Sequence, residues 1–141
     1  MKAWTDMGPT KIHYLHLSKG DDVLDCLRAM LREKDIRNGI VLTGIGTLNE
    51  CQMHGVVTPE LPAKDDYFGW KGVPIELAAL SGIIADYEPH LHMVVTLYGE
   101  ERVTYCGHIE SGCKVLCLAE ISILETTLPM RRTLDADRIN Q

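Results

Sequence analysis

Residues 89–109, PHLHMVVTLYGEERVTYCGHI, have the pattern of two strands joined by a short turn. Through HLHMVVTLY every second residue from Leu91 to Leu97 is apolar, which is the period of a strand with one face toward a core. The sequence GEE at 99–101 lies midway along the stretch and provides the turn. We therefore expect a hairpin that returns His108 to a position beside the beginning of the first strand.

This hairpin carries three histidines, His90, His92 and His108. On a strand, His90 and His92 point to the same face with Cα atoms roughly 6 to 7 Å apart, so both rings can reach one metal ion through bonds of about 2.0 to 2.1 Å. His108 supplies the third ligand if the hairpin forms. The alternative is that the first two histidines lie on a solvated strand face and that His108 is a structural residue near a turn, because short motifs often match by chance.

The remainder of the chain contains one helix candidate among further strand candidates. In KGDDVLDCLRAMLREKDI, residues 19–36, apolar residues recur with the 3.6-residue period of a helix, and Asp21 and Asp22 provide a cap and an acidic first turn. The strand candidates are β-branched or aromatic runs bounded by Gly and Pro, such as KIHYLHL, GIVLTGIGTL, CQMHGVVT, PIELAALSGIIAD and CKVLCLAEISIL. We expect an α+β fold with about seven strands and helical cover, because the regular alternation of strands and helices that a doubly wound fold requires is missing.

Three segments are expected to lie outside regular strands. GIGTLN at 44–49 lacks the third glycine of a dinucleotide-binding loop and is interpreted as a turn. The stretch between Thr58 and Val73 is interpreted as a polar loop whose aromatic residues pack onto another part of the protein. The tail at 131–141 is expected to be flexible, and the whole chain, 1–141, to form a single domain.

Composition limits the classes of function. The chain has 141 residues, 45% of them hydrophobic and 24% charged, as in an ordinary globular protein. Its formal net charge of -6 repels phosphate backbones and anionic lipid over most of the surface. The five cysteines show no C-x-x-C spacing and lie mostly in apolar runs, so we expect reduced thiols and a cytoplasmic location. No stretch approaches the roughly 20 apolar residues of a membrane helix, and the first residues lack the apolar core of a signal peptide.

Several segments together make the chain resemble the PPC domain, the plant and prokaryote conserved domain, in its stand-alone prokaryotic form. They are IELAALSGIIAD, PHLHMVVTLYG, CGHIESGCKV and LAEISI, and the resemblance spans about residues 11–124. It implies a curved, largely antiparallel sheet of about seven strands with one main helix packed on it, assembled as a homotrimer. It also implies a metal bound by the histidines that match His90, His92 and His108.

The resemblance leaves three functions open. Three neutral imidazoles leave a divalent ion with an open position, and zinc is the first choice for an all-nitrogen tetrahedral site, although Cu, Ni and Fe also bind imidazole. Such a site can hold a small molecule or anion, or it can serve a metal-dependent hydrolase or lyase, for which Glu76, Glu110 and Glu120 are candidate acid-base or ligand-orienting residues. Bacterial members of the family are usually labelled DNA-binding proteins, but this chain has only MRR at 130–132 as a basic group.

Overall fold

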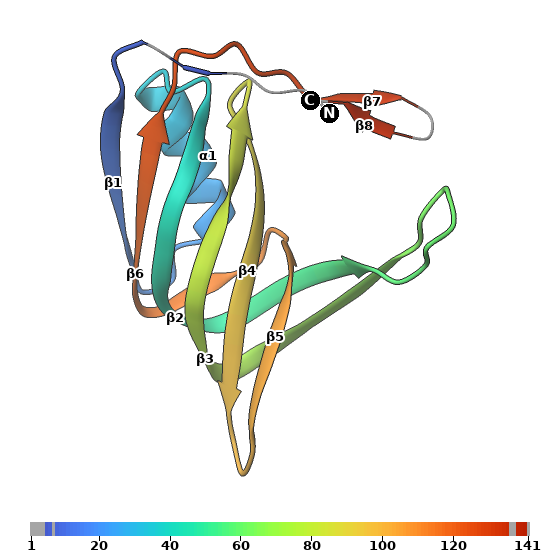
Figure 1. Ribbon diagram of the computed structural model, residues 1–141. Helices are drawn as coiled ribbons and strands as arrows, with labels where there is room; N and C mark the ends of the chain where they lie inside the picture. Colours follow the sequence, from blue (N-terminus) through green and yellow to red (C-terminus); the bar gives the residue numbers. More distant parts are fainter. Residues whose placement is uncertain (1–4, 7, 136–137, 141) are drawn as a thin grey trace.

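A computed structural model describes residues 5–6, 8–135 and 138–140 of the chain (Figure 1). Its main sheet has six strands in the order β1-β6-β2-β3-β4-β5, and its strand pairs are antiparallel. A separate two-stranded hairpin follows near the end of the chain. The elements are β1 (Lys11–Ser18), α1 (Val23–Glu33), β2 (Gly39–Val56), β3 (Asp65–Ala85), β4 (Glu88–Tyr98), β5 (Arg102–Ile109), β6 (Lys114–Glu125), β7 (Thr133–Asp135) and β8 (Arg138–Asn140). The predicted α+β class and antiparallel sheet are confirmed, with six strands in the main sheet where about seven were expected.

The sheet is strongly curved because its two longest strands, β2 and β3, bend away from its body. β2 pairs with β6 in its first half, and near its end Met53 and His54 pair with Ile109 and His108 of β5. The strands β2, β3, β4 and β5 therefore close on one another. The register shifts between Leu48 and Glu50, as expected for a bulge that increases local bending. Figure 1 shows the β2–β3 hairpin projecting from the body of the sheet.

Helix α1 covers one face of the sheet with a single apolar stripe. The buried side chains of Val23, Leu24, Leu27 and Leu31 follow the predicted helical period and belong to the main hydrophobic core. Asp22 begins the helix, since its Oδ1 accepts a hydrogen bond from the backbone N–H of Asp25 at 3.1 Å. The predicted helix and its N-cap are confirmed, but the helix ends at Glu33, before the end of the predicted stretch at residue 36.

The turn predicted at 44–49 is wrong, because these residues lie inside β2. A side chain at Gly46 would place its Cβ 2.6 Å from both Cα and Cβ of Ala119 on the neighbouring strand. Glycine is present there because two strands approach closely, and not because the chain reverses.

The loop predicted between Thr58 and Val73 is wrong in its second half, since β3 already begins at Asp65. Trp70 lies opposite Cys51 of β2, and its ring centroid is 4.5 Å from that of Tyr105 on β5. The aromatic residues pack on a neighbouring strand as expected, but they do so from within a strand.

Part of the tail is regular, because β7 and β8 form a hairpin at its end (Figure 1). The flexibility predicted for residues 131–141 stays a prediction, and residues 136, 137 and 141 lie outside the described residues.

No helix in the described part of the chain is long and apolar enough to span a bilayer. The five cysteines are free, and a hydrogen bond with Cys113, together with burial, raises the pKa of the Cys51 thiol.

Candidate metal centre

Strand pairing gathers four histidines on one face of the curved sheet. His92 of β4 and His54 of β2 are each paired with His108, which lies on β5 between them. His90 precedes His92 by two residues on β4 and therefore faces the same side. The predicted hairpin register is confirmed, since it brings His108 beside the beginning of β4.

The rings of His90, His92 and His108 form a triangle. Their centroids are 5.5 Å apart for His90 and His92, 4.9 Å for His90 and His108, and 5.7 Å for His92 and His108. A ring bound to zinc through a nitrogen about 2.0 to 2.1 Å away has its centroid about 3.2 Å from the ion, so two such rings at a tetrahedral angle have centroids about 5.2 Å apart. The ring centroids thus have about the spacing that three imidazoles around one tetrahedral ion require, but the donor nitrogens of these three histidines do not all lie within 4.8 Å of one another, so the rings would have to turn to bind one ion.

Glu110 lies beside this triangle and contacts two of the histidines. Its Oε1 accepts hydrogen bonds from Nδ1 of His54 at 2.6 Å and from Nδ1 of His108 at 2.9 Å. Two atoms that bind one tetrahedral ion at about 2.1 Å are about 3.4 Å apart, whereas 2.6 and 2.9 Å are hydrogen-bond distances. Among the described residues, the set whose donor atoms all lie within 4.8 Å of one another is His54, His108 and Glu110, which makes them a possible ligand set in their own right. The short distances favour Glu110 as the residue that orients His108 and leaves its Nε2 free.

The electrostatics favour the neutral form of His90 and His108, which is the form that binds a metal. Burial lowers the pKa of His90 to about 4, and the nearby cation Arg132 and the neighbouring histidines act in the same direction. Burial also lowers the pKa of His108, although the hydrogen bond to Glu110 opposes this effect. Both rings are therefore unprotonated near neutral pH, and no proton has to leave them before a metal binds.

Comparison with known proteins identifies the family. The sequence matches the profile of the Plants and Prokaryotes Conserved (PCC) domain over residues 5–127. The chain belongs to the PCC domain family. The resemblance drawn from the segments around the three histidines is confirmed.

Solved structures share the fold of this PCC domain. A metal-containing protein from Archaeoglobus fulgidus is similar with a TM-score of 0.77 and 21% sequence identity, and the alignment covers 100% of both chains. A protein from Bacteroides thetaiotaomicron, named a "putative dna binding protein", is similar with a TM-score of 0.76 and 19% identity, covering 97% of this chain and 94% of that one. Identities of this size show the fold alone.

A curated relative is much longer than this chain. The bifunctional protein GlmU of Synechococcus sp. (strain JA-3-3Ab) is 27% identical over 119 residues, which are 84% of this chain and 18% of GlmU. The chain thus spans less than a fifth of the length of that relative.

The other two predicted glutamates of this PCC domain lie away from the histidine cluster on β2, β4 and β5. Glu76 is exposed on β3, opposite Thr47 and Thr96. Glu120 lies on β6, where its Oε1 is 3.7 Å from Nδ1 of His16. Of the three glutamates, the structure brings only Glu110 to the site.

The sequence analysis did not single out His54. In the sequence this residue is one polar position in the strand CQMHGVVT, and no second histidine nearby marks it as the H-x-H spacing marks His90 and His92. The feature that identifies it is its pairing with His108, which depends on β5 returning to β2.

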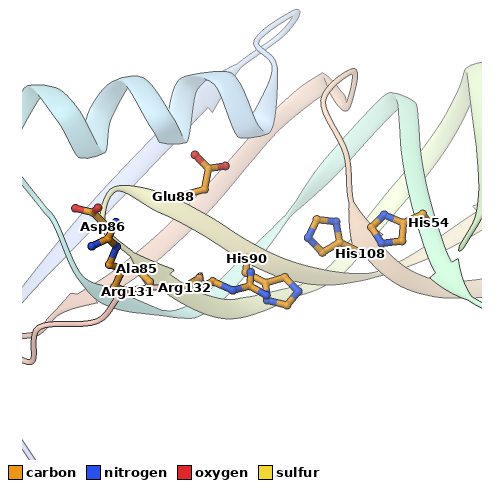
Figure 2. A pocket seen from close by; sticks show the side chains of 8 residues that line it. All are labelled: His54, Ala85, Asp86, Glu88, His90, His108, Arg131 and Arg132. Carbon is orange, nitrogen blue, oxygen red and sulfur yellow. The ribbon is translucent and has the colours of Figure 1, made fainter. Parts of the chain in front are cut away.

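A cavity of about 530 Å³ opens beside the histidines (Figure 2). It is lined by His54, Ala85, Asp86, Glu88, His90, His108, Arg131 and Arg132. Its volume lies in the range of small-molecule sites. A ligand in this cavity would therefore contact the rings of His54, His90 and His108.

Proposed function

We propose that this PCC-domain protein binds one divalent transition metal ion, preferably zinc, through His90, His92 and His108. The observation that carries the proposal is the triangle of ring centroids, 4.9 to 5.7 Å on a side, compared with the roughly 5.2 Å expected around a tetrahedral ion. The all-nitrogen donor set suits zinc, and the similarity to the metal-containing Archaeoglobus fulgidus protein supports a metal at this fold. Bound zinc would supply a Lewis acid with an open coordination position.

The residues around the triangle favour binding of a small molecule or anion over its turnover. A hydrolase or lyase needs a free acid or base near the metal. Glu110 is already engaged by two histidines. Asp86 and Glu88 line the cavity, but each is held by an arginine, at 2.8 Å from Arg37 and 2.6 Å from Arg28 respectively. We therefore place metal-dependent hydrolysis or lyase chemistry second to ligand binding at the open position.

Metal content per chain tests the metal site. Wild-type protein, purified without chelator or affinity tag, should carry about one transition metal ion per chain by elemental mass spectrometry, and His92→Ala should carry almost none. His92 is exposed, so its truncation does not disturb the core. His16→Ala is the matched control, because His16 is also exposed but lies on β1 beside Glu120. Wild type that stays empty after zinc is offered, or His92→Ala that retains the full content, would contradict the proposal.

DNA binding is the second candidate, because the Bacteroides thetaiotaomicron relative carries that name. The net charge of -6 opposes it over most of the surface. Fluorescence anisotropy with a labelled duplex at low salt separates the two functions. Salt-dependent binding that survives His92→Ala would favour the DNA function, and absence of binding at low salt would remove it.

We further propose that the protein is a cytoplasmic homotrimer. Large apolar side chains are exposed on the strands at one side of the sheet, namely Ile12, Tyr14, Ile40, Leu42, Ile45 and Leu118. Tyr14 is 82% exposed, and exposed apolar side chains gathered on the neighbouring strands β1, β6 and β2 are typical of a protein interface. Light scattering coupled to size exclusion should give three times the chain mass of 15.8 kDa, whereas a monomer would refute the assembly. The proposal of a cytoplasmic location rests on the five cysteines, which are free of disulfides, and is testable by fractionation.

A further inference from the structure

Among the described residues, the acidic side chains that line the cavity form ion pairs with arginines elsewhere, whereas the arginines that line the cavity form none. Asp86 and Glu88 pair with Arg37 and Arg28, which do not line the cavity. Arg131 and Arg132 do line it, and within the described part of the chain neither takes part in an ion pair. Among the residues that the structure describes, the positive charge of the cavity beside the histidines is therefore not compensated by an ion pair.

Arg132 is the arginine that faces the metal site. Figure 2 shows its side chain reaching along the cavity wall toward His90. Its Nε is buried from solvent and has no hydrogen-bond partner among the described residues. A buried guanidinium N–H without a partner is uncommon in proteins, and at the wall of a cavity it indicates that a ligand provides the acceptor.

The backbone near Arg132 and the turn between β3 and β4 are both hydrogen-bonded to one residue, Asn38. Asn38 is buried, and its Oδ1 accepts hydrogen bonds from the backbone N–H of Asp86 at 3.1 Å and of Met130 at 3.3 Å. Its carbonyl oxygen accepts from the N–H of Thr126 at 3.0 Å. The backbone on both sides of the cavity is thus hydrogen-bonded to one residue, which limits the movement of the chain two residues before Arg132.

We infer that Arg132 and the metal held by the three histidines together bind the oxyanion group of a small molecule, a carboxylate or a phosphate. This inference rests on the proposed metal site and names the class of its ligand. A guanidinium and a divalent ion on the same cavity wall repel each other. An anion bound between them is attracted to both cations, and these two attractions offset the repulsion. The planar fork of donors on Arg132 matches both oxyanions, whereas a neutral ligand would leave the two cations unscreened.

Anion binding to the zinc-loaded protein tests the inference. Isothermal titration with inorganic phosphate and, separately, with acetate distinguishes the two oxyanions. Wild type should bind at least one of them, Arg132→Ala should bind it at least tenfold more weakly, and Arg132→Lys should recover part of the loss. Arg102→Ala is the matched control, because it removes one positive charge from the β4–β5 hairpin, where Arg102 lies over the ring of Tyr98. The control should bind the anion as wild type does.

Metal content is measured on every sample, so that the two proposals fail separately. If wild type holds zinc but binds neither anion, or if Arg132→Ala with full zinc binds as tightly as wild type, the anion site is overturned and the metal site stands. If wild type holds no zinc, both proposals are overturned. Arg132→Ala with unchanged zinc and weakened anion binding is the result that supports the inference.

Discussion

Replacing Glu110 by alanine should weaken metal binding strongly while changing stability little. Glu110 Oε1 accepts from Nδ1 of His108 at 2.9 Å and of His54 at 2.6 Å, and the first of these bonds fixes the ring that carries a metal ligand. Loss of an acceptor behind a ligand histidine typically costs 10- to 100-fold in metal affinity, which is about 1.4 to 2.7 kcal/mol. The free energy of unfolding of the metal-free protein should fall by about 1 kcal/mol or less, since the rings are partly exposed and water replaces the lost partner.

Competition with a chromophoric chelator measures the zinc affinity of each variant, and urea unfolding of the metal-free forms measures stability. Glu110→Gln keeps an acceptor oxygen but loses its charge, so its affinity should lie between those of wild type and Glu110→Ala. Glu120→Ala is the control, because Glu120 lies on β6 beside His16. Unchanged zinc affinity in Glu110→Ala would refute the orienting role. Complete loss of zinc in both Glu110 variants would show that the carboxylate binds the metal itself.

Three further substitutions test how the fold supports the site. Asp22→Ala removes the helix cap and leaves the backbone N–H of Gly112, now 2.8 Å from Asp22 Oδ2, without its acceptor, so the free energy of unfolding in urea should fall by about 2 to 4 kcal/mol. Gly46→Ala places a Cβ 2.6 Å from Ala119, and the resulting overpacking should cost about 2 kcal/mol or more; a melting temperature equal to that of wild type would contradict this. Asn38→Ala removes an acceptor shared by two backbone N–H groups and should cost about 1 to 3 kcal/mol, with weaker anion binding, and unchanged anion affinity would show that the cavity wall does not depend on it.

The elements with strong local patterns could be predicted from the sequence. The helix follows from apolar spacing and an aspartate cap, and it begins at Val23 as expected. The β4–β5 hairpin follows from alternation on both sides of GEE, and its register pairs His92 with His108. Both elements depend on residues close together in the chain, so local periodicity is sufficient to predict them.

The parts of the site that depend on distant pairing could not be predicted. His54 reaches the cluster because β5 returns to β2, and Arg132 reaches the cavity because its segment is bonded to Asn38. No local pattern indicates either contact. The glycines at 44 and 46 were misinterpreted as a turn for the same reason, since the close neighbours that require them, such as Ala119, lie on another strand.

Anomalous diffraction at the zinc absorption edge, from a crystal of the protein loaded with zinc, tests the central claim most directly. The account predicts one peak per chain about 2.0 to 2.1 Å from a nitrogen of each of His90, His92 and His108, with Glu110 hydrogen-bonded to His108 and outside the coordination sphere. A peak bound by His54 and the carboxylate of Glu110, or a loaded crystal with no peak at these histidines, would contradict it.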